Sequence, residues 1–153
     1  MRRQGAHLLI ALAWVSIATA QSVPAQLAEV AAKAGLDRPV TAWCSGEFRA
    51  GRPGAFAVAV TSVAAGGRYL VLESDAIIHE LGPFTRRPDL SCYTRAEADR
   101  LNVTIGRSDT IHGQLAPRWN TAVICAFADD TVAVCWQYSP DEGVFVRVGG
   151  WVT

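Results

Sequence analysis

The spacing of hydrophobic residues near the start of the chain differs from their spacing in the rest of it. Between Val23 and Ala34, apolar residues recur at the three- and four-residue spacing of a helix that buries one face. Lys33 stands in the expected last turn and Gly35 follows it, which is typical of a helix end. The pattern predicts an N-terminal helix within residues 21–36. Because its apolar stripe is thin, we expect this helix to pack at the edge of the domain.

Beyond this helix, the pattern changes to short runs rich in β-branched and aromatic residues. The runs expected to form strands are 55–63, 68–74, 76–81, 121–128, 131–138 and 144–148. Gly66 and Gly67 lie between the first two runs, which predicts a two-residue hairpin turn. One interruption, Thr94 to Glu97, has the spacing of a capping box and predicts a short internal helix through about Leu101.

Several of these runs are apolar on both faces. In the run 55–63, Phe56 and Val58 lie on one face while Ala57 and Ala59 lie on the other. A sheet with one face in water alternates apolar and polar residues more cleanly. We therefore predict a mainly β fold, a small antiparallel sandwich or barrel with an N-terminal helix and one short internal helix. Residues 37–153 are expected to form a single disulfide-stabilised domain.

Residues 1–20 have the pattern of a signal peptide. Arg2 and Arg3 precede a short apolar run, and Ala18 and Ala20 supply the small residues of a cleavage site. The apolar run is shorter than the roughly 20 residues that a membrane-spanning helix needs. We expect a secreted or periplasmic protein whose mature chain has no membrane span.

The four cysteines predict two disulfides in such an oxidising compartment. If the loop between the neighbouring runs around Asp129 has three residues, Cys125 falls opposite Cys135. A two-residue loop would place Cys135 on the other face of its strand. We predict the pair Cys125–Cys135 and, by elimination, Cys44–Cys92. The spacing of Cys and His residues argues against a zinc site.

The balance of charges and the absence of several sequence motifs argue against some classes of function. Fourteen basic and fourteen acidic residues leave no net charge, which argues against electrostatic capture of nucleic acid. The chain has no phosphate-binding loop, no nucleophile elbow and no zinc-protease motif. We predict neither a cofactor nor a metal, and favour a protein that is not an enzyme.

Two histidines and a glutamate are the candidate catalytic residues. A small secreted hydrolase of phosphodiesters or glycans could use His79, Glu80 and His112 as general acid and base. However, His79 and Glu80 are neighbours in a strand-like run, where adjacent side chains point to opposite faces. This hydrolase is therefore the alternative hypothesis.

Loop residues are the candidate binding residues. Trp119 follows Pro117 and Arg118, where an indole can anchor a partner or instead cover the edge of the core. Two arginine-bearing segments, residues 49–54 and the segment with Arg86 and Arg87, are expected to be exposed, as recognition sites for anions or as ordinary solvated loops. The main hypothesis is an exported β-rich binding module that recognises a protein or a small ligand, with inhibitors among the classes that fit.

Overall fold

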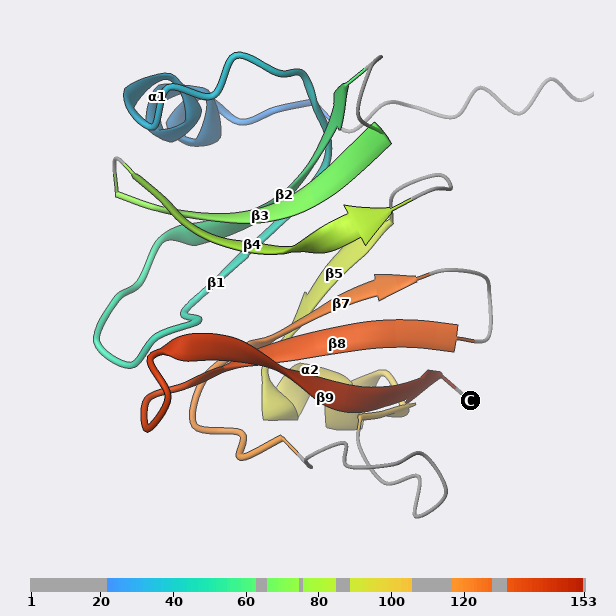
Figure 1. Ribbon diagram of the computed structural model, residues 1–153. Coiled ribbons are helices and arrows are strands. Elements are labelled where there is room, and N and C mark those ends of the chain that lie inside the picture. Colours follow the sequence, from blue (N-terminus) through green and yellow to red (C-terminus); the bar gives the residue numbers. More distant parts are fainter. Residues whose placement is uncertain are drawn as a thin grey trace, which may run out of the picture.

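The computed structural model describes residues 22–62, 66–74, 76–84, 89–105, 117–127 and 132–152 (Figure 1). The predicted signal peptide and the candidate residues Arg86, Arg87 and His112 lie outside these ranges. The elements are, in chain order, α1 (Ala25–Lys33), β1 (Val40–Gly46), β2 (Ala55–Ser62), β3 (Gly66–Glu73), β4 (Ala76–Phe84), β5 (Leu90–Tyr93), α2 (Arg95–Arg100), β6 (Val103–Thr104), β7 (Val123–Phe127), β8 (Val132–Ser139) and β9 (Val144–Val152). Among the described residues, no helix combines the length and apolar character needed to cross a membrane.

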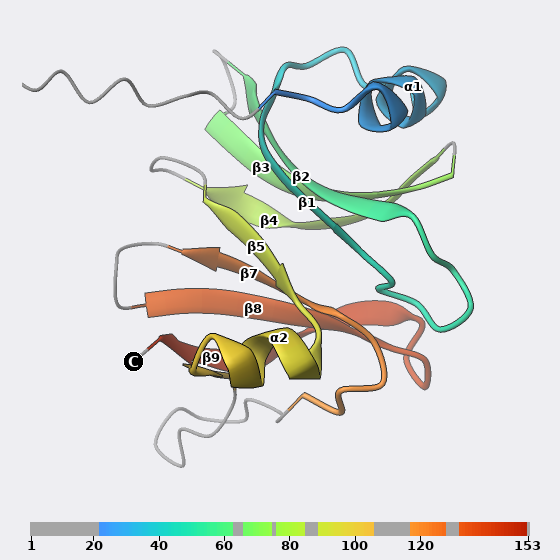
Figure 2. The same cartoon turned by 180° about the vertical axis from the view of Figure 1, so that it is seen from behind.

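The strands form two antiparallel sheets. Sheet 1 has the order β1-β2-β3-β4, and sheet 2 has the order β5-β7-β8-β9-β6. The two sheets lie face to face as the middle layers of the molecule, with α1 beyond sheet 1 and α2 beyond sheet 2 (Figures 1 and 2). The predicted mainly β antiparallel fold is confirmed, and it takes the form of a sandwich.

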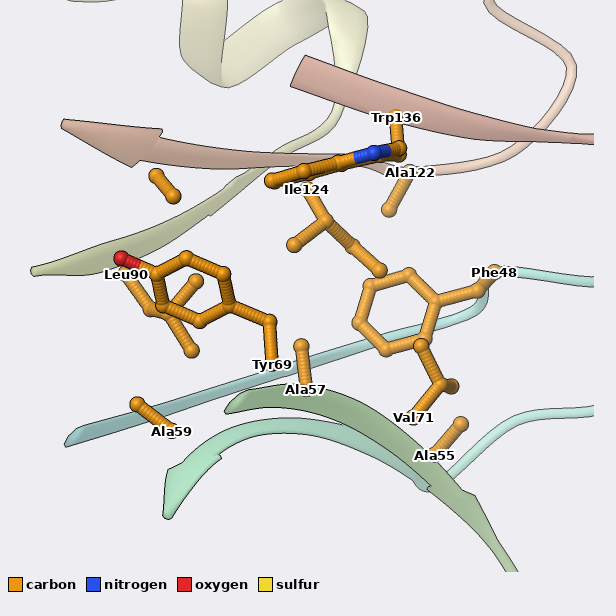
Figure 3. Close-up of a cluster of buried hydrophobic side chains, with 11 residues drawn as sticks. Phe48, Ala55, Ala57, Ala59, Tyr69, Val71, Leu90, Ala122, Ile124 and Trp136 are labelled. Carbon is orange, nitrogen blue, oxygen red and sulfur yellow. The ribbon is translucent and has the colours of Figure 1, made fainter. Parts of the chain in front are cut away.

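The core lies between the two sheets. Phe48, Tyr69 and Val71 meet Ile124 and Trp136 there, and all five side chains are buried (Figure 3). The rings of Tyr69 and Trp136 lie 5.8 Å apart between their centroids. The β2 side chains in this core, Ala55, Ala57 and Ala59, are small, so large side chains from sheet 2 can approach closely. Trp136 is thus a core residue, as its strand pattern predicts.

The outer faces of both sheets are also covered. Leu27 of α1 is fully buried against Val58 and Leu70 in the central strands of sheet 1. On sheet 2, Ala98 of α2 packs against the face that carries Cys125. α1 lies on the outside of sheet 1 because the outward face of β2 and β3 is itself apolar and requires a cover.

Local hydrogen bonds explain where α1 ends and where α2 begins. At the end of α1, Gly35 has φ +69°, and the Leu36 N–H donates to the Ala31 carbonyl at 2.9 Å. This is the geometry that favours glycine just beyond a helix. At the start of α2, the Thr94 hydroxyl accepts from the Glu97 N–H, and the Glu97 carboxylate accepts from the Thr94 N–H. The predicted capping box is confirmed.

The two glycines expected to form a hairpin turn lie inside the sheet instead. Gly66 and Gly67 begin β3 and pair with Ser62 and Thr61 of β2. A Cβ atom on Gly67 would lie 2.0 Å from ring atoms of Phe84, so the aromatic ring occupies the space of a side chain. The prediction of a hairpin is correct, but the predicted turn is wrong, because Gly67 serves the close approach of a ring.

Both disulfides have the predicted partners. Cys125 lies directly opposite Cys135 in the β7–β8 ladder, as the three-residue loop requires, and the two are bonded. Cys44 of β1 and Cys92 of β5 form the second bond, with their Cα atoms 5.6 Å apart. Because β1 belongs to sheet 1 and β5 to sheet 2, this bond joins the two sheets covalently.

Candidate functional site

Three connecting segments meet at one end of the sandwich, on the left in Figure 1. They are the β1–β2 loop at 47–54, the segment 117–122 before β7, and the β8–β9 turn at 140–143. The Ala122 N–H donates to the Glu47 carbonyl at 2.8 Å, which ties the first two segments together. We call this region the loop end. Segments held on a rigid sandwich are frequent sites of ligand binding.

The β1–β2 loop folds back on itself and brings two arginines together. The Arg52 N–H donates to the Arg49 carbonyl at 3.0 Å. Gly51, with φ +75°, donates its N–H to Oε1 of Glu47 at 2.7 Å. A side chain would strain the backbone at this positive φ, so glycine makes the tight return possible. As a result, Arg49 and Arg52 both line the small pocket described below.

A buried glutamine fixes the segment before β7. Gln137 of β8 is only 3% exposed, and its Oε1 accepts from the Arg118 N–H at 2.8 Å. Its Nε2 lies 3.4 Å from both the carbonyl and the hydroxyl oxygen of Thr121. A buried amide keeps such partners because leaving its polar atoms unpaired would cost free energy. The segment therefore has a defined position at the loop end.

Arg49 is held by a carboxylate and by an aromatic ring. Its Nη1 lies 3.0 Å from Oε2 of Glu73, a side chain that is only 8% exposed. Its Cζ lies 5.2 Å from the centroid of the Tyr138 ring, within the range of a cation–π interaction. Oε1 of Glu73 is buried without a hydrogen-bond partner among the described residues. These contacts orient the guanidinium, which keeps further N–H groups for a ligand.

His79 lies beside this ion pair, on the inner face of β4. Its ring centroid is 5.1 Å from that of Phe145 and 6.2 Å from that of Tyr138. Burial and the nearby Arg49 charge hold the pKa of His79 below its usual value of 6.5, and Glu73 partly opposes them. Both main causes disfavour the charged form of the imidazole.

We expect the pKa of His79 to respond in opposite directions to its two charged neighbours. Arg49→Gln removes a cation and should raise this pKa, whereas Glu73→Gln removes an anion and should lower it further. In the unfolded chain His79 takes up its proton near pH 6.5, before the folded protein does, so the fold should lose stability as the pH falls below that value. NMR titration of the imidazole measures each pKa. Equal values in the wild type and both variants would contradict this electrostatic account.

A small pocket opens at the loop end, on the outer side of Arg49. Its volume is about 180 Å³. Its lining comes from all three connecting segments and from β8, and consists of Arg49, Ala50, Arg52, Asn120, Thr121, Tyr138 and Pro140. Among the described residues, this lining includes two cations and several hydrogen-bond donors but no carboxylate.

His79 and Glu80, the catalytic pair of the alternative hypothesis, lie on opposite faces of their strand, as its alternation predicts. His79 lies opposite Val71, which points into the layer between the sheets. Glu80 lies opposite Leu70, whose side chain packs under α1, and Glu80 forms an exposed ion pair with Arg68. The two residues therefore occupy opposite faces of β4, and the geometry offers them no joint role.

Trp119 takes a special position in the segment before β7. Its backbone has φ +58°, and its half-buried side chain packs against the buried outer face of sheet 2. This placement agrees with the alternative given for Trp119 above, in which its indole covers the edge of the core. A role of Trp119 in binding stays a prediction, as do those of Arg86 and Arg87, which lie outside the described residues.

Sequence reasoning missed Glu73 and Tyr138, although strand alternation contains a signal for Glu73. Tyr69, Val71 and Glu73 occupy alternate positions of β3, so all three point into the layer between the sheets. A carboxylate in the inward phase of such a strand requires a cation from elsewhere in the fold. That cation, Arg49, is 24 residues away, and no local pattern links the two.

Neither a metal site nor a known relative indicates a function. Within the part of the chain that the structure describes, no three His, Cys, Asp or Glu side chains converge as metal ligands would. Comparison of the chain with protein-family models, with curated proteins and with solved structures gave no match. The functional argument therefore depends on the geometry of the loop end.

Proposed function

We propose that the protein is an exported binding module, secreted or periplasmic, that recognises its ligand at the loop end. The observation that carries this proposal is the pocket in which Arg49, Arg52 and Tyr138 converge from separate elements. The ligand is a small molecule or an exposed group of a partner protein. Inhibition of that partner is one form such recognition can take.

The construction of the loop end supports this proposal. Two disulfides are compatible with an oxidising compartment, where such bonds persist. Two parts of the pocket are held before any ligand arrives: the Arg49 side chain by Glu73, and the segment that carries Thr121 by Gln137. Preorganised groups lose little conformational entropy on binding, so more of the contact energy remains as affinity. A merely solvated loop needs no buried carboxylate behind its arginine.

Site-specific cross-linking and native mass spectrometry test the proposal. A photo-reactive amino acid at Ala50, which is exposed and lines the pocket, should capture a partner protein in the source organism. The same group at Asp99, an exposed position on α2, serves as the control. If the ligand is small, native mass spectrometry of gently purified protein should show an adduct that is lost in the double variant Arg49→Gln and Arg52→Gln.

Two outcomes would overturn the proposal. One is a folded protein that shows neither an adduct nor a cross-link specific to position 50. The other is capture of the same partner with equal yield from position 99, since binding would then not involve the loop end. Circular dichroism of each variant must show the wild-type fold, so that lost structure is not mistaken for lost recognition.

A further inference from the structure

We propose that the loop-end pocket binds a single carboxylate group, carried by a small organic acid or by the acidic end of a larger ligand. This inference rests on the proposed function and adds the chemical class of the ligand. It depends on three properties of the pocket: the donors in its lining, the local balance of charge, and its size.

The lining offers donors in the arrangement that a carboxylate requires. The guanidinium groups of Arg49 and Arg52 supply planar forks of N–H groups, which match the two oxygens of a carboxylate. The Thr121 hydroxyl lies 3.4 Å from Nε2 of Gln137, so its oxygen can accept that N–H while its own O–H points elsewhere. Tyr138, whose hydroxyl group can donate a hydrogen bond, also belongs to the lining. An anionic acceptor is the natural complement of this set.

The surrounding charges favour one negative charge over two. Two of the nearby carboxylates form ion pairs: Glu73 pairs with Arg49, and Asp141 pairs with Arg118 at 3.0 Å. Two further carboxylates belong to the loop end: Glu47, which accepts from a backbone N–H of its own loop, and the exposed Glu142 of the β8–β9 turn. These four carboxylates balance the charges of Arg49, Arg52 and Arg118, so a second negative charge on a ligand finds no further cation to offset it. A carboxylate carries one charge, whereas a phosphate monoester carries about 1.5 to 2 at pH 7.

The size of the pocket fits a small chemical group better than a whole large ligand. A volume of about 180 Å³ equals about six water molecules. It accommodates a carboxylate with a few carbon atoms, and it is smaller than the range of about 300–1,000 Å³ that is usual for drug-sized ligands. Two wider hollows among the described residues, of about 390 and 450 Å³, have acidic as well as basic side chains in their linings and lack this selectivity for an anion.

Matched pairs of acids and neutral analogues test the inference on the full chain. The probes are propionate against propionamide, D-glucuronate against D-glucose, and inorganic phosphate, each followed by NMR of the arginine side chains and of the Thr121 amide. We expect saturable shifts with both carboxylates, with dissociation constants of roughly 1–10 mM. Arg52→Gln should weaken this binding at least tenfold, and Arg95→Gln, at an exposed arginine of α2, should leave it unchanged.

The opposing results separate the two proposals. Equal binding of a neutral analogue at the same residues would overturn the carboxylate inference and leave the loop end as a ligand site. Tighter binding of phosphate than of both carboxylates would also overturn it, because it contradicts the charge argument. Shifts that stay linear with concentration for every probe would overturn it as well, and the cross-linking experiment would then decide separately whether the loop end binds a partner.

Discussion

Phe48→Ala should lower the free energy of unfolding by about 3–5 kcal/mol. Phe48 is fully buried between the sheets, and its ring lies 6.5 Å from that of Phe145 between centroids. It is also close to the backbone at Gly46, where an added Cβ would lie 3.0 Å from the Phe48 ring. Truncation therefore leaves a cavity that neighbours on strands can fill only partly. Urea denaturation, followed by tryptophan fluorescence, measures the loss.

Two further variants make this prediction specific. Phe48→Leu keeps most of the volume and should cost clearly less than the alanine variant. Leu101→Ala truncates a side chain that is 48% exposed, and it should change stability by no more than about 0.5 kcal/mol. A loss below about 1 kcal/mol for Phe48→Ala would mean that the two sheets do not depend on this ring for their packing.

Removing the bond between the sheets should have a comparable effect. The double variant Cys44→Ala and Cys92→Ala opens a ring with a sequence separation of 48 residues, which the chain-entropy model values at about 4 kcal/mol. β1 and β5 belong to different sheets, so backbone hydrogen bonds of a shared ladder do not replace the lost link. Thermal unfolding of the double variant and the wild type measures the change.

The second disulfide provides the matched comparison. Cys125→Ala with Cys135→Ala opens a ring with a separation of only 10 residues, for which the same model gives about 3 kcal/mol. Here the β7–β8 ladder already holds the two strands together. We expect the inter-sheet bond to contribute more. The reverse order would show that its contribution is not set by the length of the closed ring.

Features that depend on local spacing were predictable from the sequence. Strand alternation and loop length placed Cys125 opposite Cys135, and the spacing of Thr94 and Glu97 located the start of α2. Two-sided apolar strands indicated covered sheets, because both faces of β2 must be buried. Each of these features follows from the two-residue or 3.6-residue period of the backbone.

Features that depend on contacts between distant elements were not predictable. Gly67 is indistinguishable from a turn glycine until the Phe84 ring is known to lie over it. The loop end is a stronger case, since Arg49, Glu73 and Tyr138 come from a loop and from both sheets. A sequence displays their charges and rings, but their meeting is a property of the packed sandwich. Candidate residues chosen one segment at a time therefore missed the ion pair.

The division of the chain between the sheets has a consequence for the order in which the protein assembles. Sheet 1 uses residues 40–84 and sheet 2 uses residues 90–152, so each sheet comes from one continuous half of the chain. As the polypeptide emerges from its N-terminus during synthesis, the whole first half precedes the second. A nascent chain that ends near residue 84 contains all four strands of sheet 1 and can form that sheet while Tyr69 and Val71 still face water. At that stage the growing chain is most exposed to self-association, and it remains so until the second half arrives.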